Sequence, residues 1–129
     1  MYKKRILVID DEDNFCKLIK KNIEQTGEFE VHIATNGNDG IRLAREIKPD
    51  LILLDVIMPG MDGGDVVSLI KNDKGIKDIP ILFLTAIVRE EEASCQTSPT
   101  MGYSFLSKTV TVGELIACIK KNVKKSVQS

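Results

Sequence analysis

The pattern of apolar and polar residues along the chain predicts five strands. Three segments are short, continuous apolar runs, at residues 6–9 (ILVI), 51–54 (LILL) and 81–84 (ILFL). Such runs are typical of strands that are buried on both faces of a parallel sheet. Residues 29–33 (FEVHI) and 103–107 (YSFLS) alternate between apolar and polar instead, which indicates one wetter face. We therefore predict three central strands, with the second and fifth strands at the edges of the sheet.

Helical patterns fill the intervals between these strands. Apolar residues recur there at spacings of three and four, as on one face of an amphipathic helix. Lys48 and Pro49 end the second pattern, and Thr111 and Glu114 have the capping-box spacing that starts the last one. Two helices are predicted in this way over about residues 13–25 and 38–47. A third, shorter helix is marked by Val66, Val67 and Ile70, and the last is marked by apolar residues from Val112 to Val123.

The alternation of strands and helices predicts a doubly wound α/β domain with helices on both faces of the sheet. Three central strands and two edge strands give a five-stranded parallel sheet in the order 2-1-3-4-5, which is the flavodoxin-like (βα)5 fold. We expect one domain over residues 1–123 and a flexible C-terminal tail over residues 124–129. In this topology ligands bind at the carboxyl ends of the strands, where the order reverses between the first and third strands.

Length and charge agree with one compact domain. The chain has 129 residues, of which 43% are hydrophobic, and its formal net charge is −1. This balance argues against bulk nucleic-acid binding through a basic surface. The apolar run at residues 6–9 is too short for a signal peptide. No stretch approaches the roughly 20 apolar residues of a membrane-spanning helix.

The three cysteines, Cys16, Cys95 and Cys118, are an odd number without a Cys-x-x-Cys pair. This arrangement argues against a disulfide framework and against a zinc site. We expect reduced thiols and a cytoplasmic location, where thiols are kept reduced.

Acidic residues end two of the predicted strands. Asp10 and Asp11 follow the first strand and Asp55 follows the third. Because these strands are neighbours in the predicted sheet, three carboxylates converge at one rim. Like charges so close raise one another's proton affinity unless a cation lies between them. Mg²⁺ is the expected ion, since it prefers oxygen ligands, takes few carboxylates and keeps several waters.

A hydroxyl and an ammonium come at the ends of the other two strands on this side. Thr85 ends the fourth strand, and Lys108 follows the fifth. Carboxylates, a metal, a hydroxyl and a lysine around one rim form a site for a phosphoryl group. Taken singly, Thr85 and Lys108 are uninformative, and the aspartates also have a plain structural interpretation. Asp10 and Asp11 suit the cap of the following helix, and Asp55 suits a turn.

Four segments together resemble the receiver domain of two-component response regulators, and in particular the chemotaxis-type single receiver. They are ILVIDDE (6–12), LILLDVIMPGMDG (51–63), LTA (84–86) and FLSK (105–108). The resemblance extends from about residue 4 to residue 123. It implies a signalling module that catalyses only its own phosphorylation and dephosphorylation and is not a turnover enzyme.

The resemblance also implies roles for the acidic residues. Asp55 would accept a phosphoryl group from a histidine kinase or a histidine phosphotransfer protein. Asp10 and Asp11 would organise Mg²⁺, Asp11 directly and Asp10 through water, and Asp55 and the backbone carbonyl of Ile57 would be further ligands.

The remaining site residues have implied roles in stabilisation and switching. Lys108 would pair with the acceptor and then with the phosphoryl group. Thr85 would bond a phosphoryl oxygen, and Phe105 would turn inward as the switch aromatic. A downstream protein partner or a tethered output domain would then respond. We expect no direct nucleic-acid or membrane partner, and a monomer or a weak homodimer.

Three departures from the family pattern stand out. Thr109 follows Lys108 where the family usually has a proline, often after a cis peptide bond, so the loop either changes shape or carries strain. Residues 88–102 (VREEEASCQTSPTMG) replace the expected fourth helix, and we predict a short, shifted or mobile helix there. Gly64 stands where the family often has a larger residue.

Two other functions remain open on the sequence. A pseudo-receiver would be an interaction domain that works without phosphorylation, and the altered segment 88–109 keeps this alternative open. A phosphohydrolase of the haloacid dehalogenase type would need a second aspartate two residues after the nucleophile, where this chain has Ile57. A flavin carrier is disfavoured, because Asp10, Asp11 and Glu12 would repel a flavin phosphate.

Overall fold

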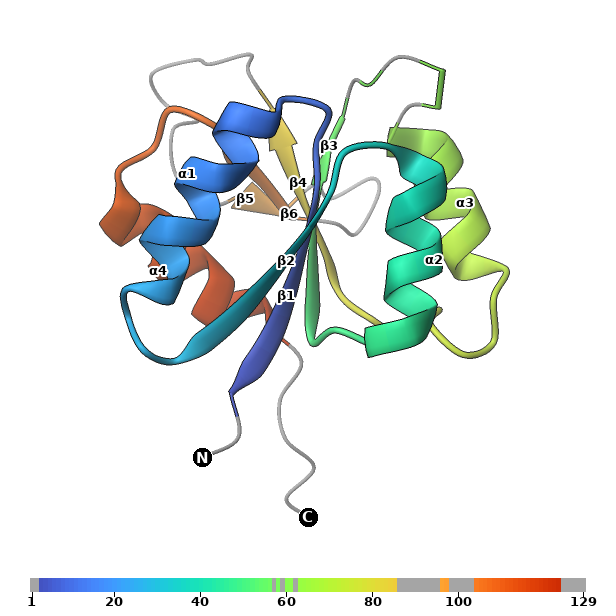
Figure 1. Cartoon of the computed structure of the whole chain (residues 1–129), viewed down its shortest axis with the longest axis horizontal. Coiled ribbons are helices and arrows are strands. Elements are labelled where there is room, and N and C mark those ends of the chain that lie inside the picture. The colour runs from blue at the N-terminus through green and yellow to red at the C-terminus, as the bar shows by residue number, and fades with distance from the viewer. Residues whose placement is uncertain are drawn as a thin grey trace.

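The computed structural model describes residues 3–56, 58, 60–61, 63–85, 96–97 and 104–123, and these residues form a sheet with helices on both faces (Figure 1). The strands are β1 (Lys4–Ile9), β2 (Phe29–Ala34), β3 (Leu51–Asp55), β4 (Ile81–Thr85), β5 (Gln96–Thr97) and β6 (Ser104–Ser107). The helices are α1 (Asp13–Glu24), α2 (Gly37–Ile47), α3 (Gly63–Lys71) and α4 (Val112–Asn122).

The five strands that were predicted are parallel and have the predicted order. The whole sheet reads β2-β1-β3-β4-β6-β5, so the parallel strands alone give the order 2-1-3-4-5. The flavodoxin-like fold is therefore confirmed. β2 is an edge strand as predicted.

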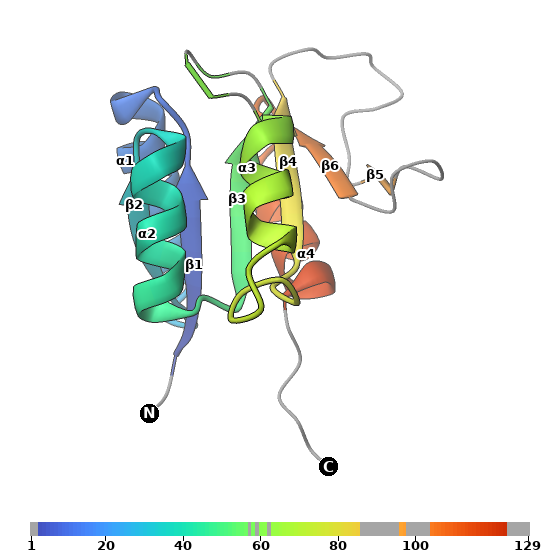
Figure 2. The ribbon, with the colours of Figure 1, turned by 90° about the vertical axis from the view of Figure 1, so that its right-hand side faces the viewer.

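The other predicted edge is wrong. β5 pairs antiparallel with β6, with Gln96 opposite Phe105 and Thr97 opposite Ser104, and it covers the far side of β6 (Figure 2). β5 has only two residues, too few to show an alternating pattern in the sequence. The alternation in β6 does not mark a wet face, because its polar residues Ser104 and Ser107 are both buried.

The core has two parts, one on each face of the sheet. α1 and α4 cover one face, and α2 and α3 cover the other (Figure 1). In β1, Ile6 and Val8 face the α1–α4 side, whereas Leu7 and Ile9 face the α2–α3 side. All four side chains are fully buried. This confirms that the continuous apolar run marks a strand covered on both faces.

The ends of the helices follow local signals that the sequence contains. Thr111 and Glu114 form the predicted capping box at the start of α4. α3 begins earlier than its apolar residues suggested, at Gly63, whose N–H donates to the carbonyl of Val56 at 2.9 Å. A Cβ at Gly63 would lie 3.1 Å from the carbonyl oxygen of Asp55, so glycine allows α3 to start directly beside this residue. The helix expected within residues 88–102 and the tail at 124–129 lie outside the described residues, apart from the strand at 96–97.

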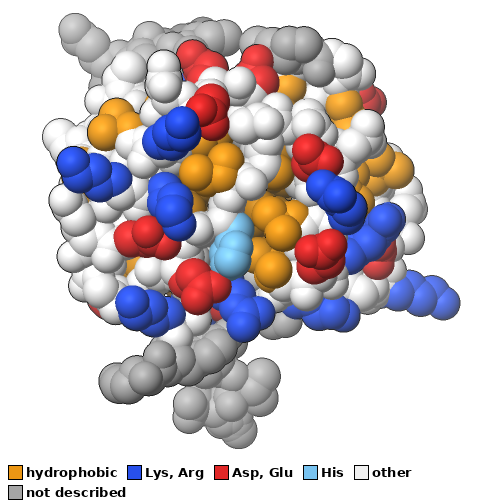
Figure 3. Space-filling model, in the orientation of Figure 1, with side chains coloured by type: hydrophobic (Ala, Val, Ile, Leu, Met, Phe, Trp, Pro, Cys, Tyr) orange, Lys and Arg blue, Asp and Glu red, His pale blue; other side chains and the backbone are white. Residues whose placement is uncertain are grey.

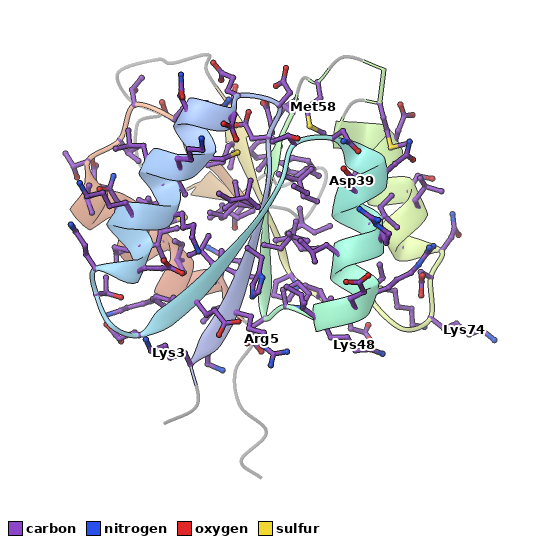
Figure 4. The ribbon with its side chains drawn as sticks, in the orientation of Figure 1. Lys3, Arg5, Asp39, Lys48, Met58 and Lys74 are labelled. Atoms are coloured by element: carbon purple, nitrogen blue, oxygen red, sulfur yellow. The ribbon has the colours of Figure 1, made fainter. Side chains whose placement is uncertain are left out.

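The two ends of the sheet have different surroundings. At the amino end of β1, the Arg5 guanidinium donates to the carbonyl of Ile47, and the Arg5 N–H donates to the Asp50 carboxylate. Figure 4 shows Arg5 and Lys48 at this end of the molecule and Met58 at the opposite end. The carboxyl ends of the parallel strands therefore lie on the Met58 side.

The visible surface carries both signs of charge. Lys and Arg side chains are interspersed with Asp and Glu side chains around the pale-blue His32 (Figure 3). His32 itself is held by Glu30, with 2.6 Å between Nε2 and the carboxylate. Among the residues that the structure describes, no helix is both long and apolar enough to cross a membrane.

Candidate phosphoryl-acceptor site

Strand register brings the predicted acidic residues together. Ile9 of β1 lies opposite Leu54 of β3, so the residues that follow them, Asp10 and Asp55, lie side by side at this end of the sheet. Asp10, Asp11 and Asp55 each offer a carboxylate oxygen, and these oxygens all lie within 4.8 Å of one another. Asp10 and Asp55 are buried and Asp11 is exposed. The convergence of three carboxylates at this rim was predicted from the sequence, and the structure shows it.

Asp10 is held rigidly at the end of β1. Its N–H donates to the carbonyl of Ala34 at 3.1 Å, and its Oδ1 accepts the N–H of Glu12 at 2.9 Å. Its Oδ2 is fully buried and meets no hydrogen-bond donor in good alignment among the described residues. The Lys108 ammonium lies 2.7 Å from this oxygen and pairs with it as a charge. Asp10 therefore points a buried, only partly compensated negative charge into the site.

The predicted lysine lies at the centre of the acidic group. Its backbone N–H donates to the carbonyl of Thr85 at 2.9 Å, which extends the pairing of β4 and β6 by one residue. Its Nζ lies 3.5 Å from Asp55 Oδ2 and 2.8 Å from Glu12 Oε1. The same ammonium lies 4.7 Å from the centre of the Phe15 ring, within the range of a cation–π contact. Lys108 is therefore shared between several partners.

The surroundings of Lys108 change its pKa. Burial would lower the pKa of the Lys108 ammonium, but the contacts with Asp10 and Glu12 and the negative charge of Asp55 outweigh burial and raise it. The group is therefore fully charged at neutral pH. A permanent positive charge beside Asp55 can offset negative charge that is brought to this carboxylate.

Thr85 and Phe105 lie on the neighbouring strands β4 and β6. Thr85 is the last residue of β4 and lies opposite Ser107 of β6. Phe105 lies opposite Phe83, and the two rings stack with their centroids 5.2 Å apart and their planes 21° apart. Phe105 is half-buried against the α2–α3 side of the core. The structure thus brings Thr85 to the rim, and the switch roles of Thr85 and Phe105 stay predictions.

One predicted ligand cannot be placed. Ile57, whose carbonyl the family resemblance assigns to the metal, lies outside the described residues. The neighbouring Val56 is placed, and its N–H donates to the carbonyl of Leu84 at 3.1 Å.

The structure adds residues that sequence reasoning missed. Glu12 and Lys108 are 96 positions apart, yet their side chains are in contact, and Phe15 lies under the same ammonium. The third acid in the run Asp10-Asp11-Glu12 was a signal for the first contact. The hydroxyl of Ser107 is buried and bonds Thr109 beside Lys108, and nothing in the sequence marked this serine.

The loop that follows Lys108, called the lysine loop below, shows how the chain departs from the family pattern at Thr109. Among the described residues there is no cis peptide bond, so the link from Lys108 to Thr109 is trans. The loop therefore differs in shape from one built on a cis proline.

The chemistry of the carboxylates fits Mg²⁺. Buried Asp10 and Asp55 with exposed Asp11 give an oxygen-rich site that is open on one side, which suits an ion that keeps several of its waters. One ammonium cannot neutralise three carboxylates, and the poorly satisfied Asp10 Oδ2 offers a further acceptor. The residues present are therefore able to hold a divalent cation.

The cysteines differ from the expectation of reduced thiols. Cys16 is a free, buried thiol, as expected, and burial together with the charges of Asp10 and Asp13 raises its pKa to about 12. It is therefore protonated at neutral pH and does not act as a nucleophile. Cys118 is disulfide-bonded, so the expectation is wrong for this residue. An odd number of cysteines still allows one pair. Cys95 lies outside the described residues.

Fold and site agree with the comparisons to known proteins. The family model described as the response regulator receiver domain matches residues 6–120. The chain belongs to the response regulator receiver family. Members of this family are signalling domains that work by phosphorylation and not turnover enzymes, and they generally bind Mg²⁺ at an acidic pocket.

Individual relatives support the same assignment. The DNA-binding dual master transcriptional regulator RpaA of Synechocystis sp. is 34% identical over 116 residues, which are 90% of this chain and 47% of that protein. The chain therefore spans about half the length of this curated relative.

Two solved structures show the same fold. The structure of Vibrio cholerae chemotaxis protein CheY4 is similar with a TM-score of 0.78 at 25% identity, covering 93% of this chain and 98% of that one. The N-terminal domain of a response regulator receiver protein from Methanoculleus marisnigri JR1 has a TM-score of 0.70 at 30% identity, covering 91% and 94%.

Proposed function

We propose that this chain is a phosphorylation-controlled receiver in which Asp55 accepts a phosphoryl group. The observation that carries the proposal is the position of the Asp55 carboxylate. It lies 3.5 Å from the Lys108 ammonium and within 4.8 Å of carboxylate oxygens of Asp10 and Asp11, at the carboxyl ends of adjacent strands. A nucleophilic carboxylate next to a cation and a metal-binding acidic pair is suited to phosphoryl transfer.

The proposed transfer conserves atoms and charge. An oxygen of the Asp55 carboxylate forms a bond to phosphorus, and the bond from phosphorus to the donor's histidine nitrogen breaks. The electron pair of that bond stays on the imidazole nitrogen, and a proton on the other ring nitrogen of the donor lets it leave as neutral imidazole. The product on this chain is an acyl phosphate. The donor is a histidine kinase or a histidine phosphotransfer protein.

Mg²⁺ would be held by Asp10, Asp11, Asp55 and the carbonyl of Ile57. When bound, it supplies positive charge that offsets repulsion between the carboxylates and the phosphoryl oxygens. Asp10 supports this role because its buried Oδ2 is fixed in place by the contacts of its backbone and its Oδ1.

Lys108 and Thr85 would stabilise the transferred group. The Lys108 ammonium already contacts Asp55 and is charged at neutral pH, so it can bond the added oxygens as they arrive. Thr85 ends β4 beside this position, and its hydroxyl would donate to a phosphoryl oxygen. Movement of Thr85 would then allow Phe105 to leave its stack on Phe83 and turn inward.

The output would be carried by a downstream protein partner or a tethered output domain. One relative is described as a DNA-binding regulator. We propose no direct nucleic-acid contact for this chain, because acidic and basic side chains are interspersed on its visible face (Figure 3) and its net charge is −1. We propose further that the chain acts as a monomer or a weak homodimer in the cytoplasm.

The proposal is tested by phosphorylation with phosphoramidate, a small donor with a phosphorus–nitrogen bond. The chain is incubated with the donor and Mg²⁺, and phosphoprotein is separated on a phosphate-affinity gel. We expect one phosphorylated species that is absent in Asp55→Asn and in excess EDTA. Asp13→Asn is the matched control, because Asp13 is an exposed carboxylate that pairs with Lys17. An unaltered chain that takes up no phosphoryl group would instead favour the pseudo-receiver.

A further inference from the structure

The residues around Lys108 form a compact turn held by hydroxyl groups. The Val110 N–H donates to the carbonyl of Ser107 at 3.3 Å, which closes a four-residue turn with Lys108 and Thr109 at its centre. The Thr109 N–H donates to Ser107 Oγ at 3.1 Å, and the two side-chain hydroxyls lie 2.8 Å apart. A serine whose hydroxyl accepts the N–H two residues later is a recognised turn-stabilising arrangement.

We propose that Ser107 and Thr109 are positioning residues that set the direction of Lys108. The inference rests on the proposed function of the Asp55 site, because it concerns the lysine that would bind the phosphoryl group. Neither hydroxyl would touch the reacting atoms. Their effect would be transmitted through the backbone of Lys108.

The backbone of Lys108 is held on both sides. On the strand side, its N–H donates to the carbonyl of Thr85 at 2.9 Å. On the loop side, the bonds between Ser107 and Thr109 fix the peptide groups that follow Lys108. A lysine side chain has four flexible methylene groups, so a fixed backbone limits the volume that its ammonium can sample. This restriction helps to hold Nζ 2.7 Å from Asp10 and 3.5 Å from Asp55.

The two hydroxyls differ in exposure, and this difference makes the proposal testable. Ser107 is buried, with 2% of its surface exposed, whereas Thr109 is exposed. When the Ser107 hydroxyl is removed, the Thr109 N–H and hydroxyl can still bond water, so the turn loosens without leaving a buried donor unpaired. Loss of lysine placement is therefore separable from loss of folding.

This arrangement needs a residue with an N–H and a side-chain hydroxyl at position 109, and a proline has neither. Proline has no N–H, so it could not donate to Ser107 Oγ, and it has no hydroxyl to pair with that atom. In this chain the pair of hydroxyls supplies the restraint that a rigid ring would supply at the same position. The buried Ser107 and the threonine that replaces the family's proline thus form one hydrogen-bonded turn.

The test compares four variants of the full chain. Ser107→Ala and Thr109→Val each remove the contact between the hydroxyls. Thr109→Ser keeps the N–H and the hydroxyl and is the conservative rescue. Ser104→Ala is the matched control, because Ser104 is also a buried serine of β6 but bonds Asn122 of α4 at 2.9 Å.

The first measurement is the rate at which the Lys108 amine reacts with an acylating reagent, read by peptide mass spectrometry against the exposed Lys17. The Lys108 side chain is 10% exposed and Lys17 is 68% exposed. We expect Ser107→Ala and Thr109→Val to raise the relative reactivity of Lys108 by about fivefold, the size of one lost net hydrogen bond. Thr109→Ser and Ser104→Ala leave it unchanged. Unchanged reactivity in the first two variants, or an equal rise in Ser104→Ala, would overturn the proposal.

The second measurement separates the inference from the proposed function. Phosphorylation at saturating donor slows by about fivefold in Ser107→Ala and Thr109→Val, while Mg²⁺ affinity measured by calorimetry stays within about twofold. A role in folding alone would instead lower the unfolding midpoint and leave the phosphorylation rate of the folded fraction unchanged, which counts against the inference. If the unaltered chain takes up no phosphoryl group, the proposed function fails, and the reactivity of Lys108 still decides whether the turn places this lysine.

Discussion

Lys108 lies closer to Asp10 than to the proposed acceptor, with Nζ 2.7 Å from Asp10 Oδ2 and 3.5 Å from Asp55 Oδ2. In the unphosphorylated chain the lysine therefore chiefly compensates the buried carboxylate of Asp10. A phosphoryl group on Asp55 would bring new acceptor oxygens and more negative charge, so the balance of contacts would shift toward Asp55. The position of Lys108 therefore links the stability of the site to its state of phosphorylation.

Replacing Lys108 with methionine should destabilise the chain, because Asp10 is fully buried and would lose its nearest positive charge. Removing one partner of a buried pair costs about 3–5 kcal/mol. The loss is measured by urea unfolding in EDTA. Lys17→Met is the control, because Lys17 pairs with Asp13 on the surface and such pairs contribute about 0–1 kcal/mol. Equal losses in the two variants would mean that the Lys108–Asp10 pair contributes no more to stability than an exposed ion pair.

Replacing Glu12 with glutamine should speed phosphorylation. Glu12 is exposed and holds the Lys108 ammonium at 2.8 Å, so its neutral counterpart leaves more of the lysine's charge for Asp55. We expect a rise of about two- to fivefold, the range for an exposed ion pair. The rise should shrink in 1 M salt. At this ionic strength the Debye length is only about 3 Å, so the interaction of exposed charges is weakened. Asp13→Asn removes the same charge without a contact to Lys108, and an equal rise in that variant would contradict this explanation.

Mg²⁺ should stabilise the folded chain, because it binds the three carboxylates only when they are brought together. A ligand at 100 times its dissociation constant adds about 2.7 kcal/mol to the free energy of unfolding. Thermal unfolding with and without EDTA measures the shift in midpoint. Asp11→Asn should remove most of this shift, because Asp11 belongs to the cluster with Asp10 and Asp55. Asp13→Asn should retain the shift, because Asp13 is not part of the cluster. Identical shifts in both variants would place the ion elsewhere.

Stability should depend on pH through Asp73, which lies away from the site. The hydrogen bond from Arg45, at 2.6 Å, and then that from the Gly75 N–H hold the pKa of the Asp73 carboxyl below its ordinary value of 3.8. Because the folded-state pKa is lowered, the stabilisation is present above pH 3.8 and is lost as the pH falls through the folded-state value. Urea unfolding should therefore show Asp73→Asn to be less stable than the unaltered chain at pH 7. The two chains should converge in strong acid, and a difference that persists there would contradict the prediction.

The sequence predicted the parts of the molecule that local patterns determine. Continuous apolar runs identified β1, β3 and β4, and the acids at the ends of β1 and β3 then followed from the order of strands. The contact of Glu12 with Lys108 depends on how a loop 96 residues away is folded, so no local pattern determines it. β5 was missed for another reason: its partners in β6 are close in sequence, but β5 has only two residues, and neither its length nor its polar composition predicts a strand.

The lysine loop shows where family resemblance stops being informative. The replacement of proline by Thr109 raised a question about the placement of Lys108, and the sequence offered no answer. The answer lies in the hydroxyl of Ser107, which is buried and bonds Thr109. A serine at the end of a strand is too common a feature to be recognised in advance.

The position of the acyl phosphate in the chain decides whether Asp55 is the phosphoryl acceptor. The chain is phosphorylated in Mg²⁺ and treated with borohydride, which reduces an aspartyl phosphate to homoserine, and the peptides are sequenced by mass spectrometry. If Asp55 is the acceptor, homoserine appears at position 55 and at no other aspartate, and none appears in a sample treated with the donor in EDTA. Homoserine at Asp10 or Asp11, or a phosphorylated chain with Asp55 unchanged, would contradict it.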